Sequence, residues 1–223
     1  MDWTTYISTL RSRIAGMQRS GAYEVRFEKW PGLTAAIIDD IDECMSEEEG
    51  MGQIHVLNDM RAFYSITNGL YLYWVFLGDD PVAPPHHPMA SATPMGHADL
   101  VFLPLIYEPP VIAGQPDIPY SNLYDDYRLF DRADGQNHVY LRFNRDKRDP
   151  DFYYKIRETG AYHLLALDFT RYMELFLECR GLIRWQEFFI ADPAYRVDPL
   201  WETWFHVNLA TLFPDTDPSR FRR

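Results

Sequence analysis

The densest group of side chains that could do chemistry is an acidic run in the first quarter of the chain. Seven of the eleven residues from position 39 to position 49 are carboxylates. Neighbouring carboxylates can bind Mg²⁺ or Ca²⁺, but a cation-binding loop also needs a glycine at its turn and oxygen ligands at alternating positions, and that order is missing here. The run predicts either a solvated helix face or an electrostatic landing site for a basic partner. Its members are Asp39, Asp40, Asp42, Glu43, Glu47, Glu48 and Glu49.

Histidines form a second candidate group. His86, His87 and His97 lie in the stretch from residue 78 to residue 99, which also holds five of the sixteen prolines. Prolines at this density remove backbone donors and predict an irregular surface loop. Adjacent histidines on such a loop do not fix tetrahedral geometry and no cysteine is near, so we expect no metal site there. A metal-dependent hydrolase that uses this loop, or a loop that contacts a partner, remains an alternative.

Sequence motifs for catalysis or cofactor binding are missing. The chain has no glycine-rich phosphate loop, no GxSxG turn, no HExxH and no zinc-ribbon spacing. Asp168 with His163, or Glu108 with Asp117, have side chains that could act as an acid–base pair. Nothing in the sequence indicates that the two side chains of either pair lie close together. Asp215 and Asp217, flanked by prolines, are expected to be turn residues. We therefore predict no catalytic, cofactor-binding or metal-binding residue.

Composition describes an acidic protein with a substantial core. The 223 residues include 47% hydrophobic and 16% aromatic residues, and the formal net charge is -12. This charge disfavours nucleic acid as a partner and would attract a basic protein. We expect most of the aromatic rings in the core, with some Tyr and Trp at a recognition surface. Two distant cysteines, the lack of a signal peptide and the lack of a membrane-spanning stretch predict a cytoplasmic protein.

The N-terminal half predicts helices that lead to a central strand. Asp2 is expected to cap a first helix that ends at Gly21, and Pro31 to begin a second one. A third helix should end at Asn68-Gly69, where glycine adopts positive φ at little cost, and a strand should follow from Leu70. The expected inner sides comprise Trp3, Tyr6, Ile7, Leu10, Ile14 and Met17 in the first helix and Leu33, Ile37, Ile38, Ile41 and Met45 in the second.

The C-terminal half predicts an antiparallel meander and then helices. Residues 99–107 indicate a strand, a turn is expected at Asp134-Gly135, and alternating residues in 139–143 and 152–156 indicate two more strands. Asp168 should cap a helix that stops at Gly181, and residues 182–190 should form another. In the last helix we expect Leu200, Trp204, Val207 and Leu212 at helical spacing, with Trp201 and Trp204 as packing anchors. The fold class is α+β, with an antiparallel sheet of about four to six strands flanked by helices.

Two segments carry a family resemblance. FYSITNGLYLYW resembles the helix-to-strand junction of the SUKH superfamily, the Smi/Knr-type domains, through Phe63, Tyr64, Asn68, Gly69, Leu70 and Trp74. LALDFTRYMELFLECRGLIRWQEFF resembles the closing segment of that family, through Asp168, Phe169, Tyr172, Gly181, Trp185 and Gln186. The resemblance covers residues 30–190. It implies one domain over 1–223, with an N-terminal helical extension (1–29), a SUKH-like core (30–190) and a C-terminal helix and tail (191–223).

The resemblance also implies a function. SUKH domains include bacterial immunity proteins that bind and neutralise a toxin, often a nuclease, and fungal regulatory adaptors. The expected partner is therefore a cognate toxin or another basic protein, bound without a cofactor and without chemistry by this chain. Charge alone suggests the surface: the acidic run from Asp39 to Glu49 and, secondarily, Asp125, Asp126 and Asp131. Neither the identity of the partner nor the oligomeric state follows from the sequence.

Overall fold

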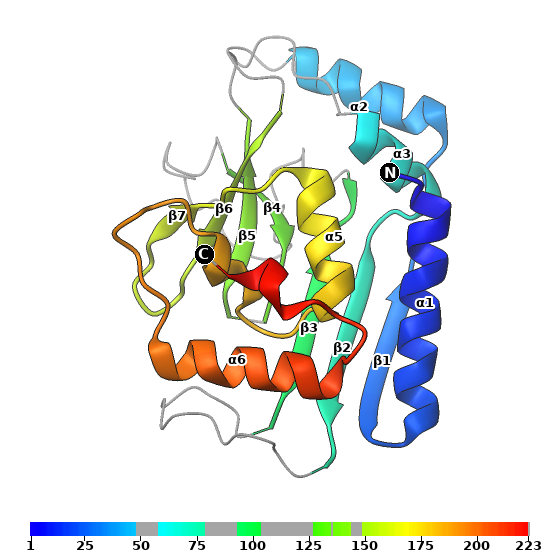
Figure 1. Ribbon diagram of the computed structural model, residues 1–223. Helices are drawn as coiled ribbons and strands as arrows, with labels where there is room; N and C mark the ends of the chain where they lie inside the picture. Colours follow the sequence, from blue (N-terminus) through cyan, green and yellow to red (C-terminus); the bar gives the residue numbers. More distant parts are fainter. Residues whose placement is uncertain (48–57, 79–92, 104–126, 135, 144–148, 223) are drawn as a thin grey trace, which may run out of the picture.

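The computed structural model describes residues 1–47, 58–78, 93–103, 127–134, 136–143 and 149–222. Within them, seven strands form one antiparallel sheet in which every strand lies beside its neighbours in the sequence, in the order β1 to β7. The helices α1, α5 and α6 lie on one face of this sheet (Figure 1). The α+β class is confirmed, while the sheet has more strands than the expected four to six.

The described residues form seven strands, five α-helices and two 3-10 helices. The strands are β1 (Tyr23–Lys29), β2 (Leu70–Phe76), β3 (Met95–Leu100), β4 (Tyr127–Asp131), β5 (His138–Arg142), β6 (Asp151–Lys155) and β7 (Tyr162–Leu164). The α-helices are α1 (Trp3–Ser20), α2 (Ala35–Glu47), α3 (Asn58–Ile66), α5 (Phe169–Cys179) and α6 (Pro199–Leu212), and two 3-10 helices are η1 (Trp185–Phe189) and η2 (Pro218–Phe221).

The junction between α3 and β2 has the predicted form. α3 ends at Ile66, Gly69 has φ +92°, and β2 begins at Leu70. The Asn68 side chain fixes this turn to the chain just after β3, because its Oδ1 accepts a hydrogen bond from the Leu103 amide at 3.0 Å. A side chain on Gly69 would meet the Leu100 carbonyl oxygen at 2.6 Å, so both the backbone conformation and the close approach require glycine here.

The core lies between the sheet and α1, α3 and α5. Alternation along the strands turns Leu72, Trp74, Phe130 and Phe152 inward, and all four are buried. The Trp74 ring nitrogen donates a hydrogen bond to the Arg180 carbonyl at 2.7 Å, which ties β2 to the end of α5. As predicted, Asp2 and Asp168 cap α1 and α5, since their carboxylates accept hydrogen bonds from backbone amides in the first turns of those helices.

The C-terminal segment crosses α5. The Arg180 guanidinium donates two hydrogen bonds to the Asp215 carboxylate, both of 2.7 Å, and Arg220 pairs with Glu174 and Glu178 of α5. These contacts place the buried Phe221 ring against the core. In α6, Trp201 and Trp204 are buried and stack with their ring centroids 4.5 Å apart, in agreement with their expected packing role.

Several sequence expectations about the elements are wrong. Residues 23–29 form β1, a strand of the sheet, although they were expected to belong to a helical extension and its connection. The strand expected over 99–107 is β3, which runs from Met95 to Leu100. Thr34 and not Pro31 precedes α2, since the Ile38 amide bonds to the Thr34 carbonyl. Residues 182–190 contain only the short η1, because Arg184, which precedes it, has φ +59°.

Two helices are rotated relative to the expected inner stripes. Ile37 of α2 is 43% exposed while Ile38 is buried, because α2 turns the Asp39 and Asp42 side toward Arg61 of α3. In α6, Leu200 and Val207 are exposed, and the buried stripe consists of Trp201, Trp204, Phe205, Asn208, Leu209 and Leu212. None of the helices in the described part of the chain has the length and apolar character needed to cross a bilayer.

Candidate protein-binding surface

The face of the sheet that points away from the helices carries six tyrosines, which we call the tyrosine face. Each of these side chains is partly buried. Among the described residues, their ring contacts are with other residues of the sheet, and no described helix supplies a ring to any of them. The six are Tyr71 and Tyr73 of β2, Tyr127 of β4, Tyr140 of β5, Tyr153 of β6 and Tyr162 of β7.

Strand register brings these rings together. Residues directly opposite each other on neighbouring strands lie on the same face, and Tyr73 pairs with His97 of β3 while Tyr140 pairs with Tyr153. The Tyr71 ring lies 5.6 Å from the His97 ring, and the Tyr127 ring lies 5.0 Å from the Tyr162 ring. The alternation that buries the inner residues therefore also assembles the aromatic surface on the other side.

Cations accompany the rings. The Arg26 guanidinium lies 5.3 Å from the centre of the Tyr71 ring, and Arg142 lies 5.5 Å from Tyr127. The Lys155 ammonium lies 5.0 Å from the centre of the Tyr162 ring. Tyrosine and arginine are enriched in the energetically important centres of protein–protein interfaces, where rigid amphipathic rings bury large areas and keep a polar tip. This composition suits recognition of another protein.

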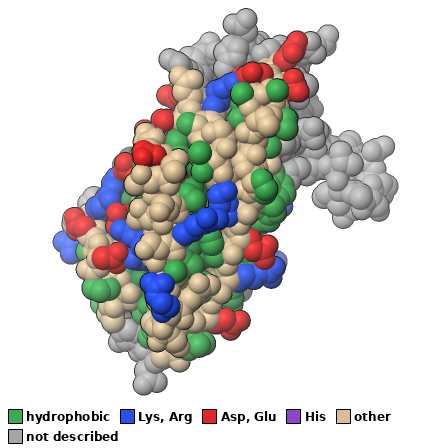
Figure 2. Space-filling model, turned by 90° about the vertical axis from the view of Figure 1, so that its right-hand side faces the viewer, with side chains coloured by type: hydrophobic (Ala, Val, Ile, Leu, Met, Phe, Trp, Pro, Cys, Tyr) green, Lys and Arg blue, Asp and Glu red, His purple; other side chains and the backbone are tan. Residues whose placement is uncertain are grey.

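Of the predicted acidic surface, the structure describes part, and two of the described carboxylates are paired with an arginine. Asp39 and Asp42 both form ion pairs with Arg61 of α3, which neutralises part of their charge. Asp40 and Glu43 are exposed, and acidic side chains gather at the upper end of the molecule in Figure 2, the end at which α2 lies. Glu47 is the last residue of α2, but its side chain is outside the described part. Glu48, Glu49, Asp125 and Asp126 also lie outside the described residues.

Asp131 was expected on the surface, and this prediction is wrong. Its side chain is only 1% exposed, at the end of β4. The Tyr172 hydroxyl donates to Oδ2 at 2.6 Å and the Asp99 amide donates to Oδ1 at 2.9 Å. Burial raises the pKa of Asp131 to about 7, although these two hydrogen bonds favour the charged form. Asp131 therefore belongs to the interior, where it joins β3, β4 and α5.

The histidines of the alternative metal hypothesis are not all described. His97 lies in β3 and not in an irregular loop, with Nδ1 at 2.6 Å from the Arg132 carbonyl oxygen. His86 and His87 are outside the described residues. Across the part of the chain that the structure describes, no group of three or more His, Cys, Asp or Glu side chains is arranged to bind a metal ion.

The other acidic residues considered for chemistry have structural partners. Asp168 caps α5, and the His163 ring lies 5.2 Å from the Tyr195 ring. Asp215 pairs with Arg180, and Asp217 caps η2. Hydrogen bonds and charge from Arg180 lower the pKa of the Asp215 carboxyl despite its partial burial. Glu108 and Asp117 lie outside the described residues.

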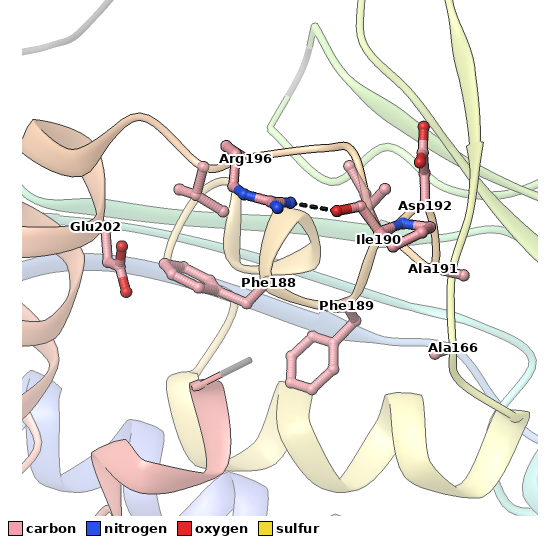
Figure 3. A pocket seen from close by; sticks show the side chains of 10 residues that line it. Ala166, Phe188, Phe189, Ile190, Ala191, Asp192, Arg196 and Glu202 are labelled. Atoms are coloured by element: carbon pink, nitrogen blue, oxygen red, sulfur yellow. Dashed lines mark hydrogen bonds between the residues drawn. The ribbon is translucent and has the colours of Figure 1, made fainter.

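A hollow of about 590 Å³ lies between η1 and the start of α6. Its apolar lining includes Phe188, Phe189 and Ile190, and Figure 3 shows Asp192 and Glu202 on opposite sides of Arg196. The Arg196 guanidinium already donates hydrogen bonds to the backbone carbonyls of two neighbouring residues. The hollow is thus lined by apolar side chains together with the charged side chains of Asp192, Arg196 and Glu202.

Sequence reasoning missed the tyrosine face as a unit. The signal was present, because Tyr71 alternates with Leu72 and Tyr153 alternates with Phe152, which places the tyrosines opposite the core. Only the register between strands shows that they share one surface.

Comparisons with family models, with curated proteins and with solved structures found no match to this chain.

Proposed function

We propose that this chain is a non-enzymatic protein-binding domain that neutralises a toxin in the bacterial cytoplasm, as an immunity protein of the SUKH type. The observation that carries the proposal is the tyrosine face, in which six tyrosines and three stacked cations occupy the side of the sheet opposite the helices. Such a surface combines large apolar area with polar tips, the composition of interface centres.

The packing of the two SUKH-like segments supports the family proposal. Phe63 from the first segment lies 5.7 Å, between ring centroids, from Phe169 of the second. Trp74 from the first segment donates its hydrogen bond to the backbone of the second at Arg180. Some of the residues that carry the resemblance thus make the contacts that join α3 and β2 to α5 and its C-terminal end.

Charge supports a basic toxin such as a nuclease as the partner. The net charge of -12 and the exposed Asp40 and Glu43 of α2 would accelerate encounter with a basic protein. The direct test is co-expression with the product of the adjacent gene, which should co-purify and lose its toxicity. A neighbouring product that is neither bound nor inhibited would contradict the proposal.

The tyrosine face makes a specific prediction for that complex. Replacing Tyr71 and Tyr73 together by alanine should weaken binding by about 30-fold or more, because central interface tyrosines commonly contribute about 2 kcal/mol. Titration calorimetry would measure the dissociation constant. The control is Leu200→Ala, which removes a side chain that is 63% exposed on α6, on the helical side. If both changes affected the dissociation constant equally, the tyrosine face would not be part of the interface.

The α2 carboxylates make a separate kinetic prediction. The double variant Asp40→Lys, Glu43→Lys should lower the association rate constant about tenfold at low salt, with a smaller effect at high salt, because it reverses charge that steers the encounter. Stopped-flow fluorescence would measure the rates. Glu158→Lys, which reverses an exposed carboxylate in the turn after β6, is the control. A change confined to the dissociation rate would contradict steering by α2.

A further inference from the structure

The sheet consists of two half-sheets that meet at a short contact, which we call the joint. Strands β1 to β3 form the first half-sheet and β4 to β7 the second (Figure 1). Among the described residues, Leu100 and Asp131 are the one pair of Cα partners between β3 and β4, because the earlier part of β3 pairs with residues 181–183. Two backbone hydrogen bonds flank this pair, donated by the amides of Val101 (3.0 Å) and Arg132 (3.2 Å).

Side chains take the place of backbone groups at the joint. In a regular antiparallel ladder, the Asp99 amide would donate to the Arg132 carbonyl. Here it donates to Asp131 Oδ1 at 2.9 Å, and the Arg132 carbonyl oxygen lies 2.6 Å from His97 Nδ1. Asp99 and Arg132 also form an ion pair. Asp131 is the buried member of this group, so the contact between the half-sheets depends on its carboxyl group.

The joint divides the tyrosine face. Tyr71 and Tyr73 belong to the first half-sheet, and the other four tyrosines belong to the second. Among the described residues, no ring contact links the two groups. The six rings therefore form one surface only while the joint holds the half-sheets at a fixed angle, and a partner that covers both groups depends on that angle.

Asp131 is a buried carboxyl group without a compensating cation. Its side chain is 1% exposed, and within the described chain it forms no ion pair, since the neighbouring Arg132 is paired with Asp99. Ionisation therefore places a negative charge in the interior beside other carboxylates, and burial raises the pKa of Asp131 to about 7. The groups that face it are the Tyr172 hydroxyl of α5, the carboxylates of Asp99 in β3 and Asp134 after β4, and the apolar side chain of Val139 in β5.

Opening of the joint is the least costly way to bring water to an ionised Asp131. Separation at the joint breaks one residue pair, whereas separation within either half-sheet breaks three or more. α5 can stay bound to both half-sheets, since Trp74 bonds to the Arg180 carbonyl and the Phe152 ring stacks on Tyr172. Opening would therefore change the angle between the half-sheets and leave each of them folded.

We infer that Asp131 is a pH switch for partner binding: its neutral form keeps the joint closed, and its ionisation opens the joint and divides the tyrosine face. The inference rests on the proposed protein-binding function and adds its regulation by protons. Because the closed joint holds the proton, and the partner binds the closed joint, binding is strongest where Asp131 is protonated and weakens as the pH rises. Asp131 lies in the interior, so it positions the binding surface without touching the partner.

Amide hydrogen exchange of the full chain, read by NMR, tests the opening. After correction for the intrinsic rise of exchange with pH, protection of the Val101 and Arg132 amides should fall at least tenfold between pH 6 and pH 8. At pH 8 their exchange should depend weakly on urea, as for a local opening. The amides of Phe76 and Leu165, each bonded within one half-sheet, should depend on it strongly. In Asp131→Asn, protection at the joint should be equal at both pH values.

Binding of the adjacent gene product tests the consequence. Its dissociation constant, measured by titration calorimetry, should rise about tenfold more between pH 6 and pH 8 for the wild-type chain than for Asp131→Asn. Because both proteins meet the same partner, titration of the groups of the partner cancels in this comparison. Glu158→Gln, at an exposed site, should follow the wild-type chain.

Other outcomes would overturn the inference. Equal protection of Val101 and Arg132 at pH 6 and pH 8 would show that the joint stays closed, and strong urea dependence would show that the whole chain unfolds instead. Both measurements use the wild-type chain, so they stand even if the Asn variant does not fold. Equal pH dependence of binding for the wild type and Asp131→Asn would contradict the switch and leave the proposed function in place. If the adjacent product binds at neither pH, the proposed function fails, and exchange in the free chain still decides whether Asp131 controls the joint.

Discussion

Replacing Gly69 by alanine is expected to lower the free energy of unfolding by about 3 kcal/mol or more. Its φ of +92° lies where a side chain costs about 1–2 kcal/mol. In addition, the new Cβ would approach the Leu100 carbonyl oxygen to 2.6 Å, and backbone cannot yield as a flexible side chain does. Relieving that contact by moving the backbone costs about 1–3 kcal/mol more. Urea denaturation would measure the loss.

A matched glycine separates the two causes. Gly160 also has positive φ, +67°, but a Cβ there would meet no atom within 4 Å. Gly160→Ala should therefore show only the conformational part, about 1–2 kcal/mol. Equal losses at the two positions would mean that the approach of β2 to the end of β3 does not constrain residue 69.

Asp131→Asn is expected to remove much of the dependence of stability on pH between about 4 and 7. Burial raises the pKa of Asp131 from its ordinary 3.8 to about 7, so the folded chain holds a proton there that the unfolded chain has lost. Stability from this group is therefore fully present below about pH 4 and is lost as the pH rises through about 7. The difference between 3.8 and about 7 corresponds to on the order of 4 kcal/mol.

The measurement is urea denaturation of both proteins from pH 5 to pH 8. The wild-type chain should lose stability across this range, while the Asn variant should change much less and should be the more stable protein at pH 8. Groups facing Asp131 include the carboxylates of Asp99 and Asp134, which raise its pKa further, and the Tyr172 hydroxyl, which lowers it. Glu158→Gln, at an exposed site, is the control. Parallel curves for the wild type and the Asn variant would show that Asp131 stays ionised.

The hydrogen-bond chain around Asp131 explains why an amide should be tolerated. Gln186 donates from Nε2 to the Tyr172 oxygen at 3.1 Å, and Tyr172 donates to Asp131. The Oε1 atom of Gln186 is buried without a partner. If residue 131 becomes a donor, as a protonated acid or as an asparagine, Tyr172 can accept from it and donate to a rotated Gln186 amide. The side chains of residues 131, 172 and 186 can therefore form a hydrogen-bond chain whether residue 131 accepts from Tyr172 or donates to it.

Local signals allowed a large part of the fold to be predicted. The Asp2 and Asp168 caps and the Asn68-Gly69 stop depend on residues only a few positions apart, so the sequence contains all the information needed. Strands β5 and β6 were found because their alternation is regular. β1 has the same alternation, with Tyr23, Val25 and Phe27 between charged residues, although our sequence analysis predicts a connection there.

Nonlocal contacts explain what the sequence did not show. Arg61 turns α2 about its axis through ion pairs with Asp39 and Asp42, about twenty residues away, and exposes Ile37. Asp131 is buried because the β4–β5 register shifts between Leu129 and Asp131, which directs two consecutive residues inward. A carboxylate in a polar sequence gives no sign of such a shift.

The order of the strands bears on how this chain folds. Every strand pairs with its neighbour in sequence. From β4 to β7 the connections are short, so this half of the sheet can grow through successive hairpins, whereas residues 30–69 separate β1 from β2 and residues 101–126 separate β3 from β4. Among the described residues, the contacts of greatest sequence separation join the two ends of the chain: Arg13 of α1 pairs with Asp215 at 3.4 Å, and the Tyr23 hydroxyl donates to the Leu212 carbonyl at 3.2 Å. Formation of the meander is therefore expected to precede docking of the two chain ends, and the late step of folding is the meeting of α1 and β1 with the segment that follows α6.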